Sequence, residues 1–116
     1  MPVTDVQIAK ATSVDQILRK VYYYVVNGWP RTVADEILPY KHRAEALSIE
    51  KGCLLMGYRV IIPQQLQDYV LDELHHNHIG MVRMKALARG YAWWPNMDAE
   101  IENRVRSCME LSLIHI

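Results

Sequence analysis

Three of the five histidines in this chain lie within four positions, in the segment Leu74-His75-His76-Asn77-His78. Cys108 follows thirty positions after His78. Histidine and cysteine are side chains that zinc prefers, and ligands on two separated segments can hold together a domain too small to be stable without metal. Taken alone, two histidines and a cysteine are a weak indication of a metal site, and surface histidines clustered by chance are the favoured account.

Composition excludes several classes of protein without selecting one. The 116 residues are 51% apolar, which suits one globular domain or one domain with an appended segment. Thirteen acidic and thirteen basic residues argue neither for nor against nucleic acid. No run approaches the ~20 apolar residues of a membrane-spanning helix, and residues 1–5 lack the features of a signal peptide. Two cysteines are too few for a disulfide framework, so a reducing compartment is expected.

The first part of the chain, residues 1–46, reads as helical. Thr4 with Gln7, and Ser13 with Gln16, each fit a capping box, in which a hydroxyl and an amide satisfy exposed N–H groups. Apolar residues recur at helical spacing over residues 14–25, and Gly28 follows as a left-handed stop.

Residues 47–63 change character and predict strands. Runs at 47–50 and 53–56 flank a turn at Gly52, and a third β-rich run covers 58–62. The expected fold class is therefore mainly α with some β: N-terminal helices, a small antiparallel β-hairpin or sheet, and then a zinc-stapled three-helix bundle resembling a helix-turn-helix.

That bundle is predicted over residues 64–110. Apolar spacing indicates one helix before the histidines, a second over 82–88 and a third from about Asn96, with Trp93-Trp94 in the core. A unit of under fifty residues buries too little surface to exceed its chain entropy comfortably. Structural zinc contributes on the order of 10 kcal/mol or more of folding free energy. An ion tying the end of the first helix to Cys108 would therefore stabilise this bundle.

Several motifs together carry a family resemblance. They are Arg59-Val60-Ile61-Ile62-Pro63, Leu74-His75, His78, Gly80, Val82-Arg83-Met84-Lys85-Ala86-Leu87-Ala88-Arg89, Trp93-Trp94-Pro95, Asp98 and Cys108. The pattern resembles the HHCC zinc-binding domain of retroviral-type integrases, and is most similar to the version in the Pol polyprotein of gypsy-type LTR retrotransposons. Upstream, Asn27-Gly28-Trp29-Pro30 and Cys53-Leu54-Leu55 resemble the segment that joins reverse transcriptase to integrase. Residues 1–46 are then an extension from that junction, 47–63 a small β segment and 64–110 a truncated zinc-binding domain.

The resemblance implies that His75, His78 and Cys108 are zinc ligands. It leaves His76 as an outward-facing neighbour or an off-register substitute. The family's second cysteine follows the first by three residues, where this chain has Leu111, so the expected site lacks its fourth ligand. His115 is a weaker candidate for that place, because its offset of seven residues from Cys108 is unlike the family's.

The last six residues, 111–116, do not resemble an integrase. They correspond to a reading of the DNA string CTG TCT CTT ATA CAC ATC, which is similar to a transposase mosaic-end adapter used in sequencing libraries. We expect that the natural coding sequence breaks off after Glu110 and that residues 111–116 are an adapter-derived tail. The alternative is a natural apolar terminus.

The resemblance also implies a domain that performs no chemistry. In integrases the zinc domain helps to assemble multimers and contacts the ends of the element's DNA, while a separate RNase H-like core performs strand transfer. The fragment is therefore expected not to be an enzyme. Its expected partners are element DNA ends and, in the parent protein, an integrase homo-oligomer, with no membrane and no small-molecule substrate. The parent integrase would act in virus-like particles and the nucleus.

Basic residues on the second helix of the bundle are the predicted phosphate contacts: Arg83, Lys85 and Arg89. The alternative is that these are solvated bases whose stems cover apolar surface. A different class of function is a metal-free helical interaction adaptor, domesticated from such an element. A hydrolase with a three-ligand zinc would need a general base, and no hydrolase motif surrounds Glu73 or Glu110.

Overall fold

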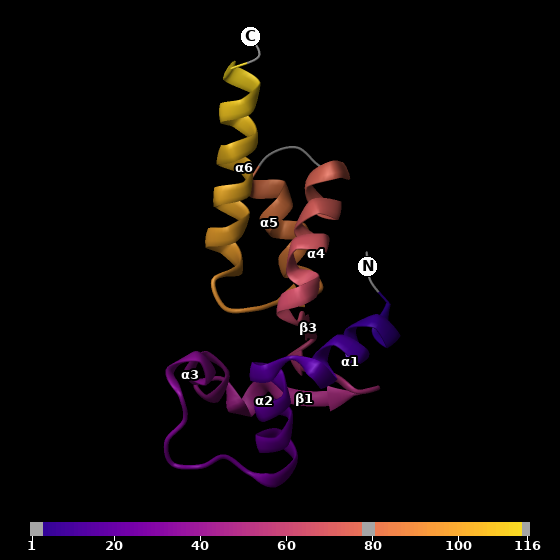
Figure 1. Cartoon of the computed structure of the whole chain (residues 1–116), viewed down its shortest axis with the longest axis vertical. Helices are drawn as coiled ribbons and strands as arrows, with labels where there is room; N and C mark the ends of the chain where they lie inside the picture. The colour runs from indigo at the N-terminus through magenta and orange to yellow at the C-terminus, as the bar shows by residue number, and fades with distance from the viewer. Residues whose placement is uncertain (1–3, 78–80, 115–116) are drawn as a thin grey trace.

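The computed structural model describes residues 4–77 and 81–114, with the side chains of residues 4–75 and 82–107. The elements within these residues, in chain order, are α1 (Asp5–Val14), α2 (Gln16–Asn27), η1 (Asp35–Ile37), α3 (Leu38–Lys41), η2 (Ala44–Ala46), β1 (Leu47–Glu50), β2 (Cys53–Met56), β3 (Arg59–Ile61), α4 (Gln64–Asn77), α5 (Met81–Arg89), β4 (Ala92–Trp93) and α6 (Met97–Ile114). The molecule is elongated, with extents of 55 × 28 × 22 Å. Figure 1 shows the N-terminal elements at one end and α4, α5 and α6 at the other.

Local signals fix the ends of the first two helices. The predicted capping box at α1 is confirmed: the Gln7 N–H donates to Thr4 Oγ1 at 3.2 Å, and the Thr4 N–H donates to Gln7 Oε1 at 2.9 Å. The predicted capping box of Ser13 with Gln16 is wrong, because Ser13 lies within α1 and its hydroxyl donates to Lys10 O. Asp15 caps α2 instead, and its carboxylate accepts from two backbone N–H groups of the first turn. Gly28 has φ +105° and ends α2, as its position predicts.

The sheet has the strand order β1-β2-β3-β4. The three predicted strands are confirmed, with β1 antiparallel to β2 and β2 antiparallel to β3. The expectation of a purely antiparallel sheet is corrected by β4, which pairs in parallel with β3 and matches Val60 with Ala92. The Val60 N–H donates to Tyr91 O at 2.7 Å. A two-residue strand has no periodicity of its own, so the sequence offered no signal for it.

The buried residues form two groups. The bundle core consists of Ile8, Cys53, Ile62, Val70, Leu71, Leu74, Met84, Ala88, Ala92, Trp94, Met97, Ile101 and Val105. The sheet core consists of Leu18, Val21, Ile37, Tyr40, Leu54, Met56, Ile61 and Trp93. Both tryptophans predicted to be core are buried, but the pair divides, with Trp93 in the sheet core and Trp94 in the bundle core.

The predicted three-helix bundle is present as α4, α5 and α6, and the predicted class of mainly α with some β is confirmed. Figure 1 shows α4 and α6 running in the same direction, with α5 packed against both. The bundle core also takes in Ile8 from α1 and Cys53 from β2, so packing crosses the boundary predicted at residue 63. In the described part of the chain, no helix combines the length and the apolar character needed to cross a membrane.

Candidate metal centre

Two of the predicted zinc ligands, His75 and Cys108, belong to the bundle helices α4 and α6. His75 is half-buried in the last turn of α4, next to buried Leu74. The other predicted or alternative ligands lie outside the described side chains: His76, His78, Cys108 and His115. The convergence of His75, His78 and Cys108 on one ion therefore stays a prediction.

The described residues do set how α4 and α6 lie relative to each other. Arg104 of α6 pairs with two carboxylates of α4, contacting Asp72 through Nη1 and Asp68 through Nη2 at 3.1 Å. Position 75 lies three residues beyond Asp72, and position 108 lies four residues beyond Arg104. With a rise of about 1.5 Å per residue, both positions follow the ion pair by about 5 Å along parallel helices. The backbone therefore brings positions 75 and 108 to a similar level.

The donor set suits zinc chemically but is incomplete. Imidazole nitrogen and thiolate sulfur are zinc's usual ligands in structural sites, which are four-coordinate. Position 111, one turn beyond Cys108 on α6, carries Leu111 and supplies no donor. Within the described side chains, no three His, Cys, Asp or Glu groups are placed to hold a metal ion.

The described bundle core ends near this same level. Leu74 of α4 and Val105 of α6 are the last buried residues of these helices among the described side chains. Thus His75 and Cys108 occupy positions just beyond them. Zinc bound there would continue the contact between the two helices past the end of the described apolar packing.

Two of the three predicted phosphate contacts are already paired with carboxylates. Lys85 Nζ lies 2.5 Å from Glu102 Oε1, and Arg89 pairs with Asp98 through two nitrogens. The hydrogen bond from Lys85 lowers the pKa of Glu102, and the hydrogen bond from Arg89 lowers the pKa of Asp98. Arg83 is exposed and forms no ion pair with a described side chain.

These acidic partners on α4 and α6 were missed by the sequence reasoning. Asp68 and Asp72 are four residues apart on α4, as are Asp98 and Glu102 on α6. Residues four apart share a helix face, so each spacing indicated an acidic stripe. Which lysine or arginine side chains pair with these carboxylates depends on how the helices pack, and the spacing alone does not indicate it.

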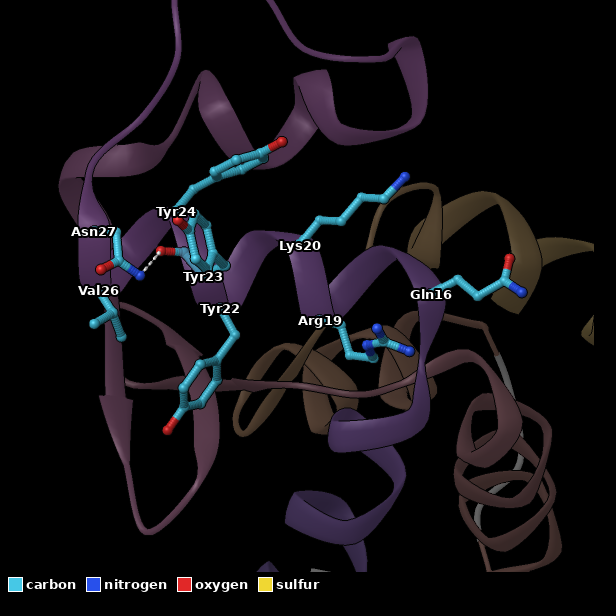
Figure 2. A pocket seen from close by; sticks show the side chains of 8 residues that line it. All are labelled: Gln16, Arg19, Lys20, Tyr22, Tyr23, Tyr24, Val26 and Asn27. Atoms are coloured by element: carbon cyan, nitrogen blue, oxygen red, sulfur yellow. Dashed lines mark hydrogen bonds between the residues drawn. The ribbon is translucent and has the colours of Figure 1, made fainter.

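A hollow of about 760 Å³ lies along α2. Figure 2 shows its lining side chains fanning out from this one helix, with Lys20 and Tyr24 extending to one side and Arg19 and Tyr22 to the other. A ligand site normally needs polar groups that converge. The hollow is therefore an open helix surface and not a binding cavity.

Comparison with known proteins identifies the bundle. Residues 62–110 match the family model described as the integrase zinc binding domain. This part of the chain belongs to the integrase zinc-binding domain family. The match contains α4, α5, β4 and α6 as far as residue 110, and it confirms the predicted resemblance to an integrase zinc-binding domain.

One curated relative extends the similarity beyond the integrase zinc-binding domain. The uncharacterized protein K02A2.6 of Caenorhabditis elegans is 38% identical over 109 residues, which cover 92% of this chain and 9% of that protein. The chain therefore spans less than a tenth of that relative's length. No solved structure matches the chain.

Proposed function

We propose that this chain is a piece of the Pol polyprotein of a gypsy-type LTR retrotransposon, and that it carries a non-catalytic module for zinc-dependent folding, integrase multimerisation and contact with element DNA ends. The observation that carries the proposal is the family match over residues 62–110, which coincides with the α4–α6 bundle. The ligand pattern at one end of this bundle supports a structural role for the metal.

In this proposal His75, His78 and Cys108 hold the zinc ion. The family pattern has the four protein ligands of a structural zinc site, so the ion would supply folding free energy, and Leu111 would leave one of the four positions without a protein ligand. The ion pairs of Arg104 with Asp68 and Asp72 hold α6 beside α4 close to the ligand positions.

Arg83 is the first of the proposed DNA contacts on α5. Its side chain is exposed and unpaired within the described residues, so a phosphate would meet no competing carboxylate on it. Lys85 and Arg89 would have to exchange Glu102 and Asp98 for phosphate. Arg83 should therefore contribute more to DNA affinity than either of them.

Two measurements test the proposal. Elemental analysis of purified protein should give close to one zinc per chain, and a gel shift with duplex DNA of the element ends should weaken steeply with salt. Arg83→Gln should reduce DNA affinity more than the matched change Arg19→Gln on α2. Protein without zinc and without a DNA shift would contradict the proposal.

A metal-free helical adaptor is the second candidate, and Leu111 in a ligand position is the observation that favours it. This candidate predicts a folded α4–α6 bundle in protein that has been stripped of metal. Circular dichroism of chelator-treated protein separates the two candidates: retained helicity and an unchanged melting temperature support the adaptor.

A further inference from the structure

A hollow of about 480 Å³ lies between the N-terminal elements and the start of α6. Its basic lining side chains come from three separated segments: Arg43 follows α3, Arg59 begins β3 and Arg89 ends α5. Among the described lining residues, Asp98 is the one carboxylate. We call this the three-arginine hollow. Three guanidinium groups facing one carboxylate leave an excess of positive charge.

The wall of the hollow holds Arg43 in place. Its guanidinium carbon lies 5.4 Å from the centre of the Trp93 ring, which is a cation–π distance, and its Nη1 donates to Pro39 O at 3.4 Å. Trp93 is buried and packs edge-on against Tyr40, with ring centres 5.6 Å apart. A guanidinium placed on a fixed ring loses little freedom when it binds a ligand.

The other two arginines differ in how they are engaged. Arg89 is shared with Asp98, whereas half-buried Arg59 forms no ion pair with a described side chain. The pKa of Asp98 is lowered first by its hydrogen bond from Arg89, with the charges of Lys85 and Arg59 adding to the effect. Arg59 is therefore close enough to act on an anion in the same place, and it has no carboxylate of its own.

The start of α6 adds to the positive field. Met97 and Asp98, the first two residues of this long helix, line the hollow, and Asn96 before them adopts φ +66°. The N-terminus of a helix carries partial positive charge, which favours an anion in front of it. This contribution comes from the backbone and is independent of the arginine side chains.

We propose that the three-arginine hollow binds a backbone phosphate of nucleic acid. Guanidinium groups match phosphate oxygens through paired N–H donors, which is why arginine is common where phosphate is recognised. Arg43 and Arg59 lie outside residues 62–110, so this contact would extend the DNA-binding surface beyond the integrase zinc-binding domain. The identity of the ligand rests on the proposed DNA contact, but the anion site itself does not.

The first test removes the two arginines that have no carboxylate partner. Arg43→Gln/Arg59→Gln should weaken binding of a labelled DNA duplex tenfold or more at low salt, in fluorescence anisotropy. The steepness of log affinity against log salt should fall by about 1, since one phosphate contact is lost. The control Arg19→Gln/Lys20→Gln removes two charges from the α2 surface shown in Figure 2 and should change the slope less. Equal losses in the two variants would overturn the proposal.

A gain-of-function variant keeps the test valid if the double variant folds poorly. Asp98→Asn removes the competing carboxylate and should raise the affinity for DNA and for inorganic phosphate severalfold. Asp5→Asn makes the same charge change at the start of α1, away from the hollow, and should have little effect. An unchanged or reduced affinity in Asp98→Asn would count against the site.

Melting measurements in inorganic phosphate distinguish a failure of this inference from a failure of the proposed function. Wild-type protein should melt at a higher temperature in phosphate than in chloride of equal ionic strength, the double variant should not, and DNA should compete with the phosphate. If wild type binds DNA but both variants behave as wild type, this inference fails and the proposed function stands. If wild type binds no DNA, the proposed DNA contact fails. A phosphate effect that requires Arg43 and Arg59 would then assign the hollow to free phosphate and overturn its nucleic-acid role.

Discussion

The sheet core and the bundle core differ in what surrounds them. Aromatic contacts accompany the sheet core: Tyr24 packs on Trp29 with ring centres 5.3 Å apart, and Tyr40 packs on Trp93. Ion pairs instead join the helices of the bundle, linking α5 to α6 and α6 to α4. Surface ion pairs contribute little stability, so the bundle depends more on its apolar core and on any bound metal.

The bundle also draws on residues outside its own segment. Ile8 of α1 is 1% exposed and Cys53 of β2 is 4% exposed, and both belong to the bundle core. Burial raises the pKa of the Cys53 thiol, with Asp5 and Glu50 adding to the effect. Cys53 is therefore a neutral packing group of the bundle core. The segment matched by the family model thus receives part of its stability from the chain before it, and we propose that zinc supplies another part.

The largest expected effect comes from replacing either of the two adjacent tryptophans, which belong to different cores. Trp94→Ala should destabilise the protein by about 3–5 kcal/mol, because the ring is 2% exposed in the bundle core. Amide hydrogen exchange should then rise mainly in α4, α5 and α6. Trp93→Ala should raise exchange mainly in α2 and α3. Identical exchange patterns for the two variants would show that the cores unfold as one unit.

The next effect tests whether α1 supports the bundle. Ile8→Ala should cost about 2–5 kcal/mol in urea unfolding, because a buried side chain is removed from the bundle core. Val6→Ala on the same helix is the control: Val6 is 73% exposed, so its loss should change stability by less than about 0.5 kcal/mol. If Ile8→Ala leaves exchange in α4–α6 unchanged, the bundle does not depend on α1.

A smaller effect is expected from restoring the missing ligand. Leu111→Cys should raise zinc affinity at least tenfold, or about 1.4 kcal/mol, because it supplies a thiolate one turn beyond Cys108. Competition with a chromophoric chelator measures the change, and the melting temperature in zinc should rise with it. Leu111→Ser controls for the loss of the leucine. Equal zinc affinities for the two variants would show that a residue at position 111 does not bind the metal.

The smallest effect concerns the ion pairs that join α5 to α6. Asp98 and Glu102 have lowered pKa values in the folded protein, so each contributes stability above its unfolded pKa and loses it as the pH falls. Unfolding free energy should therefore decline as pH drops below about 4. Asp98→Asn should make that decline shallower in acid urea titrations. A slope equal to that of wild type would show that the Arg89 pair does not affect stability.

Periodic and local features of this chain were predictable. The apolar spacing in α4 and α6, the capping box at Thr4 and the glycine stop at Gly28 each act within a few residues, so sequence alone indicates them. The family motif likewise located the bundle and placed His75 at the end of α4.

Features made by packing were not predictable. β4 forms only because the residues after α5 meet β3, and the three-arginine hollow joins Arg43, Arg59 and Arg89 from three separated segments. The pairing of Lys85 with Glu102 depends on how α5 rotates against α6. The spacing of residues in the sequence does not indicate these contacts between elements. The ligand convergence remains predicted from the motif, because His78 and the Cys108 side chain lie outside the described residues.

The central claim is that His75, His78 and Cys108 bind one metal ion. Its most direct test is the absorption spectrum of protein refolded with Co²⁺ in place of zinc. The account predicts a sulfur-to-cobalt charge-transfer band at one equivalent of metal. The band should disappear in Cys108→Ser, persist in Cys53→Ser and weaken in His75→Ala. No band in wild type, or a band that survives Cys108→Ser, would contradict the account.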